Sequence, residues 1–443
     1  MLYRISRYII ISVFLICQNF SAYAITYVVG QGENYLTPNA LYVADVLGAG
    51  DTIHIKAQDY IGTDATAVWL VDNVVIKGIG GQPHLIADGA YIWGKGIWVL
   101  FGNNITVENI KFSGATVPDK NGSGIRLDGT GMTVRYCNFH NNENGILTSS
   151  PFSGDILIEH SEFAYNGFGD GQSHNLYINH VNKLTFQYNY SHHANSGHNL
   201  KSRAAENIII YNRIMDEDNG NASRLIDLSN GGRSTIMGNL LMQGPNAENN
   251  NLIGYGLEGL QSGQINELYI YNNSMVNKRV ASCIFVALNT QTGFAEIINN
   301  IFAGTGTIVE GNPNVYRNNY NNENITTIGF TNEQNYDYTL QSNSPAIDLG
   351  TSSINSIPTN VYIHPLQSEM RMTSNVSIDA GAYEFDQGTD IINPIKIDLS
   401  IESGDILIED NQHGLVLKSI DGKCFRLVVD SSGGLSSVLI SCD

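Results

Sequence analysis

Residues 173–204 read SHNLYINHVNKLTFQYNYSHHANSGHNLKSRA, and one phrase occurs twice in this stretch. HNLYI at residues 174–178 returns 24 residues later as HNLKS at residues 198–202. A phrase that returns along a chain indicates structural repeats that stack on one another. Five of the chain's eleven histidines also lie between residues 174 and 198. If the two copies stack, histidine, tyrosine, lysine and arginine side chains gather on one patch of surface.

Short apolar phrases that end in a turn residue recur along the chain, at a mean spacing of 26 residues and with single steps of 18 to 33. They occupy residues 105–109, 133–137, 156–160, 184–188, 208–211, 268–271 and 296–299. Further strands are expected at residues 124–128, 145–148, the two histidine phrases and residues 225–228. Two or three short strands per repeat, rich in Gly and Asn, predict a solenoid of parallel strands. No long stretch of helical periodicity supports a helical repeat.

An asparagine follows most of these phrases. The asparagines expected at this corner are Asn189, Asn212, Asn239, Asn272, Asn300 and Asn318. Asparagines at the same corner of successive coils can hydrogen-bond to one another. The sequence therefore predicts an amide ladder, which is partial because the earlier coils place Ile110, Cys137 and Ser161 at this corner.

The first residues resemble a secretory signal peptide over residues 1–24. Arg4 and Arg7 precede an apolar run, and Ala22-Tyr23-Ala24 forms a cleavage site. The apolar run is too short to span a bilayer, and no later stretch predicts a membrane span. We therefore expect an exported protein, periplasmic or extracellular, that acts as a monomer.

The remaining chain predicts three parts: a solenoid domain at residues 25–385, a linker at 386–396 and a small β module at 397–443. Thr37 and the proline after it are typical of a helix start. We expect a short helix there that covers the open end of the first coil and stops at Gly48. Such a cap is needed because a terminal coil exposes an unpaired strand edge.

Four cysteines follow the expected signal peptide. Cys424 and Cys442 lie close together in sequence and are expected to form a disulfide in an oxidising compartment. Cys137 and Cys283 lie in apolar strand contexts and are expected to be buried free thiols.

The formal charge of the chain is −19, and −21 without Arg4 and Arg7. This charge argues against nucleic acid or an anionic membrane as a partner. An anionic substrate therefore needs a local basic patch or a bound cation. Lys201 and Arg203 supply two neighbouring cations against this acidic background.

Several longer phrases carry a resemblance to a known family. They are VENIKFSGATVPDKNGSGIRLDG at 107–129, SNGGRSTIMGN at 229–239, SPAID at 344–348 and DAGAYE at 379–384. Over residues 26–385 the chain resembles the right-handed parallel β-helix, pectate-lyase-like superfamily, and in particular a group of exported bacterial β-helix proteins. The resemblance implies an all-β fold and polysaccharide substrates, handled by lyases, hydrolases, epimerases or binding modules. Fold alone does not choose among these activities.

Strand alternation predicts which side chains of the histidine phrases face outward. With Leu176, Leu200 and Ile226 inward, one outward column contains Tyr177, Lys201 and Asp227. A second outward column contains Asn179, Arg203 and Ser229. We expect Asn175 and Asn199 to face outward as well, and His174 and His198 to pair where the strands begin.

This set of side chains suits β-elimination on a uronic acid. That reaction needs a base for the C5 proton, neutralisation of the adjacent carboxylate and an acid for the leaving oxygen. We expect Lys201 to act as the base and Arg203 to neutralise the carboxylate through its planar fork. Tyr177 or His198 would supply the proton, with His174 beside them.

Other side chains are expected to contact an acidic polysaccharide around these five. The predicted binding residues are Asn175, Asn179, Asn199, Asp227, Arg233 and Arg126. The acidic segment at 216–221 alternates oxygen-bearing side chains in a manner suited to calcium, with Asp216 and Asp218 as ligands.

Several alternatives remain open. The same groups would serve a C5 epimerase, and the solenoid could bind or adhere to glycans without catalysis. A glycoside hydrolase needs two carboxylates roughly 5 to 9.5 Å apart, whereas Asp128 and Asp227 are expected about 19 Å apart. Lys201 and Asp227 could also be a surface ion pair of little energetic value.

Overall fold

The computed structural model describes residues 24–149, 154–372 and 377–385, and the backbone of three further strands near the C-terminus. By internal contacts the chain divides into two units, Met1–Phe385 and Asp386–Asp443. The expected signal peptide, linker and Cys424–Cys442 disulfide fall largely or wholly outside the described residues. In the second unit, β38 (Val416–Lys418), β39 (Cys424–Val429) and β40 (Leu435–Ile440) pair as an antiparallel sheet.

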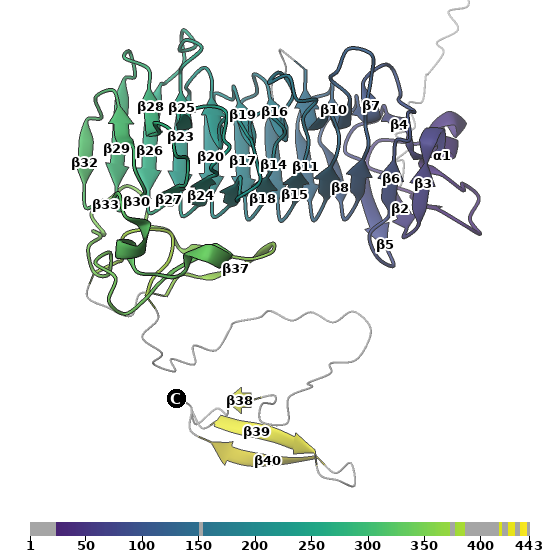
Figure 1. Ribbon diagram of the computed structural model, residues 1–443. Helices are drawn as coiled ribbons and strands as arrows, with labels where there is room; N and C mark the ends of the chain where they lie inside the picture. The colour runs from purple at the N-terminus through teal and green to yellow at the C-terminus, as the bar shows by residue number, and fades with distance from the viewer. Residues whose placement is uncertain are drawn as a thin grey trace, which may run out of the picture. The chain divides into compact units, whose positions relative to one another are not determined.

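The first unit is a parallel β-helix with three sheets, each built from one strand per coil (Figure 1). Among the described residues, sheet A contains β1 (Thr26–Val29), β2 (Thr52–Lys56), β5 (Val75–Ile79), β8 (Ile105–Glu108), β11 (Met132–Arg135), β14 (Asp155–Glu159), β17 (Lys183–Gln187), β20 (Glu206–Ile210), β23 (Arg233–Met237), β26 (Glu267–Tyr271), β29 (Phe294–Ile298) and β32 (Val315–Arg317). The predicted all-β solenoid is confirmed.

Sheets B and C complete each coil. Sheet B contains β3 (Asp59–Ile61), β6 (His84–Ile86), β9 (Lys111–Ser113), β12 (Asn138–His140), β15 (Glu162–Ala164), β18 (Tyr190–His192), β21 (Arg213–Met215), β24 (Leu240–Gln243), β27 (Ser274–Asn277), β30 (Ile301–Ala303) and β33 (Tyr320–Asn322). Sheet C contains β4 (Ala67–Trp69), β7 (Gly96–Leu100), β10 (Ser123–Leu127), β13 (Asn144–Thr148), β16 (Leu176–Ile178), β19 (Leu200–Ser202), β22 (Ile226–Leu228), β25 (Asn251–Tyr255), β28 (Ile284–Leu288) and β31 (Thr307–Glu310).

Stacked side chains fill the interior, because strands about 4.8 Å apart place equivalent inward residues directly over one another. The rings of Phe112, Phe139 and Phe163 stack with centroids 4.9 Å apart at each step and are nearly parallel. Cys137 and Cys283 are buried free thiols, as predicted. Apolar rows of this kind make the solenoid one continuous core.

Buried asparagines form a ladder at the corner between sheets A and B. Its members are Asn189, Asn212, Asn239, Asn273, Asn300 and Asn319, and each side-chain amide donates to the carbonyl oxygen of the next. The ladder is confirmed, but two predicted members were one residue too early. Asn272 and Asn318 instead occupy left-handed turn positions, with φ of 49° and 52°, a conformation that asparagine tolerates.

A short helix covers the first coil. α1 (Pro38–Ala44) begins after Thr37, whose side chain accepts from the backbone N–H of Ala40 at 3.1 Å. Leu41 of this helix is fully buried and belongs to the core of the solenoid. The helix ends at Ala44 rather than at Gly48, because Asp45 already adopts a left-handed conformation.

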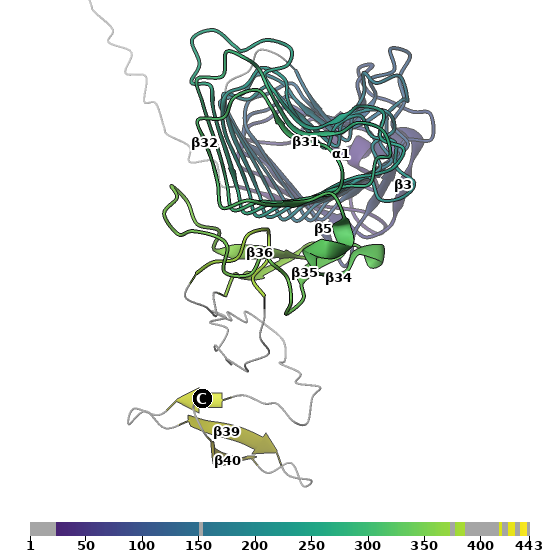
Figure 2. The same cartoon turned by 60° about the vertical axis from the view of Figure 1, so that its left-hand side comes forward.

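Residues 323–372 and 377–385 leave the solenoid and fold back over the outer face of sheet B, a feature that the sequence did not predict (Figure 2). Their elements are η2 (Ile325–Ile328), β34 (Phe330–Asn332), η3 (Glu333–Asn335), β35 (Asp337–Leu340), β36 (Asn360–Ile363) and β37 (Gln367–Met370). Apolar residues such as Met242 and Val276 on the outside of sheet B pack against them. Buried Arg371 fixes the segment by an ion pair of 2.6 Å with Glu384. The predicted column of Tyr177, Lys201 and Asp227 lies on a different face, that of sheet C.

No helix among the described residues is both long and apolar enough to cross a membrane.

Candidate functional site

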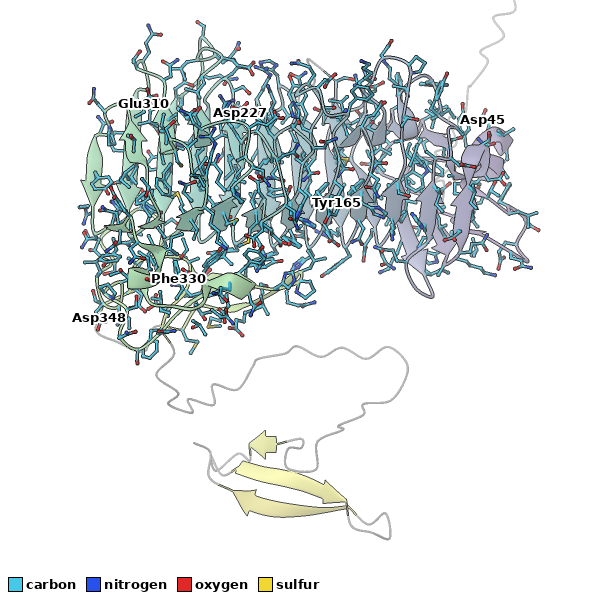
Figure 3. The ribbon with its side chains drawn as sticks, viewed as in Figure 1. Asp45, Tyr165, Asp227, Glu310, Phe330 and Asp348 are labelled. Atoms are coloured by element: carbon cyan, nitrogen blue, oxygen red, sulfur yellow. The ribbon has the colours of Figure 1, made fainter. Side chains whose placement is uncertain are left out.

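The two histidine phrases lie side by side on sheet C, as the sequence predicts. β16 pairs with β19, and β19 with β22, in a register that aligns Tyr177 with Lys201 and Lys201 with Asp227. The inward neighbours Leu176 and Leu200 are fully buried. The predicted outward column is therefore confirmed, and Asp227 is labelled in Figure 3.

A carboxylate from another coil joins this column. Glu258 lies in the turn after β25, and its Oε1 accepts a hydrogen bond of 2.6 Å from Nζ of Lys201. Its Oε2 accepts from Nη2 of Arg203. Burial acts to raise the pKa of Glu258, but the hydrogen bonds from Lys201 and Arg203 outweigh it and lower the pKa to about 2. An ammonium and a guanidinium thus bind one carboxylate together.

Arg203 is held on three sides. Its Nε donates to Oη of Tyr177 at 2.7 Å, and its Nη1 donates to Oδ1 of Asn230, in addition to the bond to Glu258. These contacts fix the plane of the guanidinium. Since Oη of Tyr177 accepts from Arg203, and no contact found among the described residues takes its hydroxyl hydrogen, the phenol keeps a proton to donate.

Asp227 lies behind Lys201 and is fully buried. Its Oδ2 accepts from Oγ of Ser229 at 2.5 Å and lies 3.7 Å from Nζ of Lys201. Its Oδ1 lies 3.3 Å from Nη1 of Arg224. A buried carboxylate needs such partners, because an uncompensated buried charge is strongly destabilising. Asp227 therefore positions Lys201 from beneath it on the outer face, and its predicted contact with the substrate is wrong because it is out of reach of solvent.

The two histidines form the predicted pair. Their rings are stacked with centroids 4.7 Å apart and an angle of 11°. Nδ1 of His174 accepts from the backbone N–H of His198 at 3.0 Å, and Nδ1 of His198 accepts from that of Arg224 at 3.2 Å. Burial, with positive Lys201 and Arg224 nearby, lowers the pKa of His198 to about 3. Burial and the neighbouring His198 hold the pKa of His174 well below its ordinary value.

Both histidines are therefore neutral at physiological pH, with Nε2 carrying the hydrogen. Nε2 of His198 lies 3.6 Å from Oδ2 of Asp227. Only 6 % of His198 and 2 % of His174 are exposed. The pair lies beneath the outer face, beside Asp227, rather than at the surface.

The predicted outward orientation of Asn175 and Asn199 is wrong. Both are fully buried and belong to a second interior amide ladder, in which Asn175 Nδ2 donates to Oδ1 of Asn199 at 3.0 Å. The strands begin only at Leu176 and Leu200. The alternation of a strand therefore does not extend to the corner residues before them, whose side chains turn inward.

Arg126 and Asn179 lie on the same face of sheet C but outside the cluster. Arg126 is in the column of Lys201, three coils away. Its Nε donates to Oδ1 of Asp128 at 2.8 Å. Asn179 directly follows β16 and is aligned with Arg203, because the preceding residues of the two strands are paired. Both residues are partly exposed.

Arg233 was expected to reach the groove, but it begins β23 on sheet A and forms an ion pair of 3.3 Å with Glu267. The charged residue that does join the cluster is Glu258, which sequence reasoning missed. The only local signal was a single acid in the glycine-bounded turn GLEG at 256–259. Its pairing with residues more than fifty positions earlier depends on the stacking of coils.

Asp216 and Asp218 do not come together as calcium ligands would. Asp216 is buried and ends the second amide ladder, where Asn199 Nδ2 donates to it at 3.1 Å. Burial raises its pKa to about 7. Asp218 faces outward and lies 3.5 Å from Nζ of Lys278. No group of three or more His, Cys, Asp or Glu side chains in the described part of the chain is arranged to hold a metal ion.

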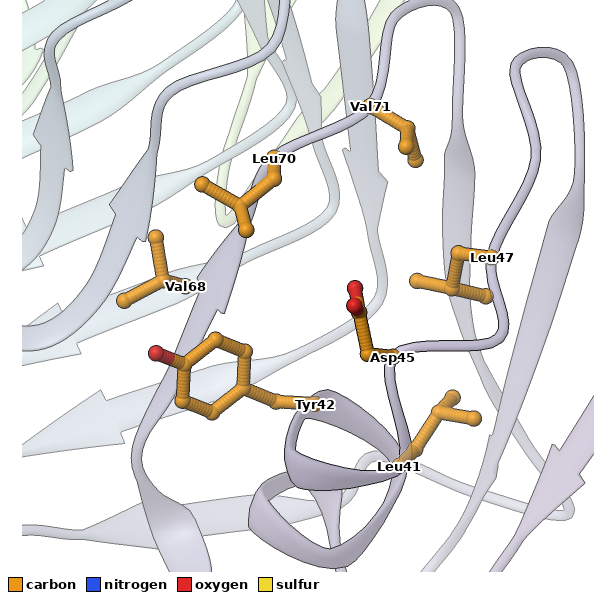
Figure 4. Close-up of a pocket in the computed structure, with 7 residues that line it drawn as sticks. All are labelled: Leu41, Tyr42, Asp45, Leu47, Val68, Leu70 and Val71. Carbon is orange, nitrogen blue, oxygen red and sulfur yellow. The ribbon is translucent and has the colours of Figure 1, made fainter.

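A small pocket lies beside α1, among the first coils of the solenoid (Figure 4). Its lining residues are Leu41, Tyr42, Asp45, Leu47, Val68, Leu70 and Val71. None of the residues in the Lys201 cluster contributes to it.

Comparisons with known proteins agree with this architecture. Residues 71–189 match the family model described as a right handed beta helix region. A search of curated proteins gave no match. Among solved structures, the crystal structure of pectate lyase Pel9A superimposes with a TM-score of 0.54 at 12 % identity, over 82 % of this chain and 96 % of that chain. The predicted right-handed parallel β-helix is confirmed, and at this identity the likeness shows the fold alone.

Proposed function

We propose that this protein is exported and acts on a uronic-acid-containing polysaccharide at the outer face of sheet C, by β-elimination. The observation that carries the proposal is the binding of one carboxylate, that of Glu258, by Lys201 and Arg203 together. A uronate carboxylate has the same charge and geometry. It would replace Glu258, whose side chain is 43 % exposed and lies in a turn.

Each group then has one task. Arg203, held by Tyr177 and Asn230, neutralises the substrate carboxylate through two of its nitrogens. When Glu258 is displaced, Lys201 must first release one proton to solvent, and the resulting neutral amine then removes the C5 proton. Tyr177 protonates the leaving oxygen, since its hydroxyl accepts from Arg203 and keeps its own hydrogen.

The reaction is balanced within these groups. The C5–H bond breaks and its proton moves to Nζ of Lys201, while charge develops on the carboxylate beside Arg203. The C4–O bond then breaks as a double bond forms between C4 and C5. The leaving oxygen takes the proton of Tyr177, and solvent restores both groups to their starting states.

Binding without cleavage is the second candidate, and a specific observation favours it. Only 10 % of the Lys201 side chain is exposed, and in this structure its ammonium is occupied by two carboxylates, those of Glu258 and Asp227. If Glu258 does not move, Arg203 and Tyr177 can still contact a sugar, but no base is available.

Incubation with polygalacturonate, alginate and chondroitin sulfate, each with and without a chelator, tests the proposal. A lyase produces an unsaturated uronide that absorbs in the ultraviolet. An epimerase exchanges solvent deuterium into C5 without new absorbance, and a binding protein does neither. Loss of activity with the chelator would show that a divalent cation is needed, at a site other than Asp216 and Asp218. Hydrolysis to saturated ends would contradict β-elimination.

A further inference from the structure

We propose that Trp93 and Phe101 form a separate sugar-binding subsite on the outer face of sheet C, about four sugar units from Arg203. The inference deepens the proposed function and rests on it. The two rings are in edge contact, with centroids 6.0 Å apart and an angle of 77°. They are 52 % and 51 % exposed, so both rings reach solvent.

The backbone at Trp93 adopts a left-handed conformation. Residues 92–95 form a tight turn, in which Lys95 N–H donates to the carbonyl of Ile92 at 2.9 Å. Both central residues have positive φ, 51° for Trp93 and 67° for Gly94. A turn of this type prefers Asn or Gly at its first central position. Other bulky residues of the solenoid, such as Tyr136 and Tyr188, also adopt this left-handed conformation, so it fixes the backbone at Trp93 without marking a site by itself.

Burial does not account for a tryptophan at this position, because half of its surface is exposed. The turn precedes β7, whereas Phe101 follows it, so contact between the rings means that the turn folds back along the strand. Trp98 and Trp69, by contrast, are fully buried in the core. The fold thus presents one tryptophan at the surface on a fixed backbone.

Phe101 lies in the same outward column as Arg203. Leu100 pairs with Leu127, and the register continues through β13 and β16 to β19, so Phe101 and Arg203 are four coils apart. At the spacing of parallel strands this separation is about 19 Å. A hexose in an extended chain is about as long as that spacing, so a polysaccharide on this face passes from Arg203 to the aromatic pair in about four units.

The residues between the two ends suit a sugar chain. Asp128, Ser149 and Asn179 continue the column and are partly exposed. Arg126 offsets the charge of Asp128 at 2.8 Å. The apolar C–H face of a pyranose packs on an aromatic ring, and ligand sites combine such surfaces with a few polar groups. The aromatic pair therefore binds a distal sugar unit of the same chain, charged or neutral.

Tryptophan fluorescence tests this subsite directly. The chain has three tryptophans, and Trp93 is the exposed one. Tri- and octasaccharides of galacturonate and of mannuronate serve as probes, with acrylamide as quencher. We expect a bound octasaccharide to shield Trp93 and a bound trisaccharide, held at Arg203, to leave it accessible. Equal shielding by both, or none by either, would overturn the subsite.

The variant Trp93→Asn removes the ring and supplies a residue that the turn prefers. We expect the octasaccharide affinity to fall about ten-fold, the trisaccharide affinity to stay constant and the melting temperature to stay the same or rise. Tyr316→Ala, which removes an exposed aromatic ring on sheet A, is the matched control and should change neither affinity. A lower melting temperature with unchanged octasaccharide affinity would show that Trp93 is structural.

The outcomes separate the two proposals. Octasaccharide shielding without turnover contradicts β-elimination and supports the subsite. Turnover with equal kcat/KM for both lengths and no shielding contradicts the subsite alone. Absence of both binding and turnover contradicts both. Dimerisation that Trp93→Asn abolishes would assign the aromatic pair to a second copy of the chain and overturn the subsite.

Discussion

Oε1 of Glu258 lies 2.6 Å from Nζ of Lys201, although 57 residues separate them in the chain. The contact spans two coils of the solenoid, from the turn after β25 back to β19. It makes Glu258 an internal competitor for any anion that binds Lys201 and Arg203. Removing the negative charge of Glu258 should therefore change the affinity for an anionic substrate without unfolding the site.

Glu258→Gln should increase the affinity for trigalacturonate about ten-fold, which corresponds to about 1.4 kcal/mol. The amide keeps the size of the side chain but gives up the charge that satisfies both cations. Calorimetric titration measures the change, and Glu267→Gln, which removes an acid paired with Arg233 on sheet A, is the control. Weaker binding in Glu258→Gln would mean that Glu258 supports the substrate instead of competing with it.

Lys201→Ala should reduce turnover by about a thousand-fold, within the range expected for the loss of a general base. The fold should survive, since Asp227 keeps its contacts with Ser229 and Arg224. Lys183→Ala, on the exposed face of sheet A, is the matched control. Full activity of Lys201→Ala in a folded protein would remove this residue from the mechanism.

Arg203→Lys keeps the positive charge but loses the fork that contacts Tyr177, Asn230 and Glu258 together. We expect kcat to fall while trisaccharide affinity changes little, because a lysine still attracts the carboxylate but no longer orients it. Steady-state kinetics over a range of substrate concentrations distinguishes the two effects. An unchanged kcat would show that charge alone is sufficient.

Asn199→Ala should destabilise the fold by about 2–4 kcal/mol, because it leaves the amide of Asn175 and the backbone N–H of Ala194 without their buried acceptor. Urea unfolding measures the loss. Asn195→Ala, an exposed asparagine four residues earlier, should cost less than about 0.5 kcal/mol. Equal effects of the two variants would contradict a structural role for the ladder.

Lowering the pH should reduce the free energy of unfolding through the protonation of His198 in the unfolded chain. The pKa of His198 is about 3 in the fold, well below the value of an unfolded histidine. Between these values the unfolded chain binds the extra proton, so stability falls as pH decreases. From pH 7 to pH 5 the expected loss from His198 is about 2 kcal/mol. His198→Gln should show a correspondingly smaller difference between urea unfolding at these two pH values.

The sequence predicted the column of Tyr177, Lys201 and Asp227 because it follows from two local regularities. The repeated phrase sets the register, and strand alternation sets the side of the sheet. The same reasoning failed at Asn175 and Asn199, which lie one residue before the strands, where alternation does not apply.

The sequence by itself determined the solenoid, its interior and the outward positions within strands, since these depend on the spacing of apolar residues along a few neighbouring positions. Only the tertiary structure decided which turn reaches across two coils to place Glu258 on Lys201, and that residues 323–372 and 377–385 cover sheet B. It also decided that Trp93 meets Phe101 across the length of β7. These contacts depend on the paths that turns and the C-terminal segment take outside the strands, and the periodicity of the strands carries no information about those paths.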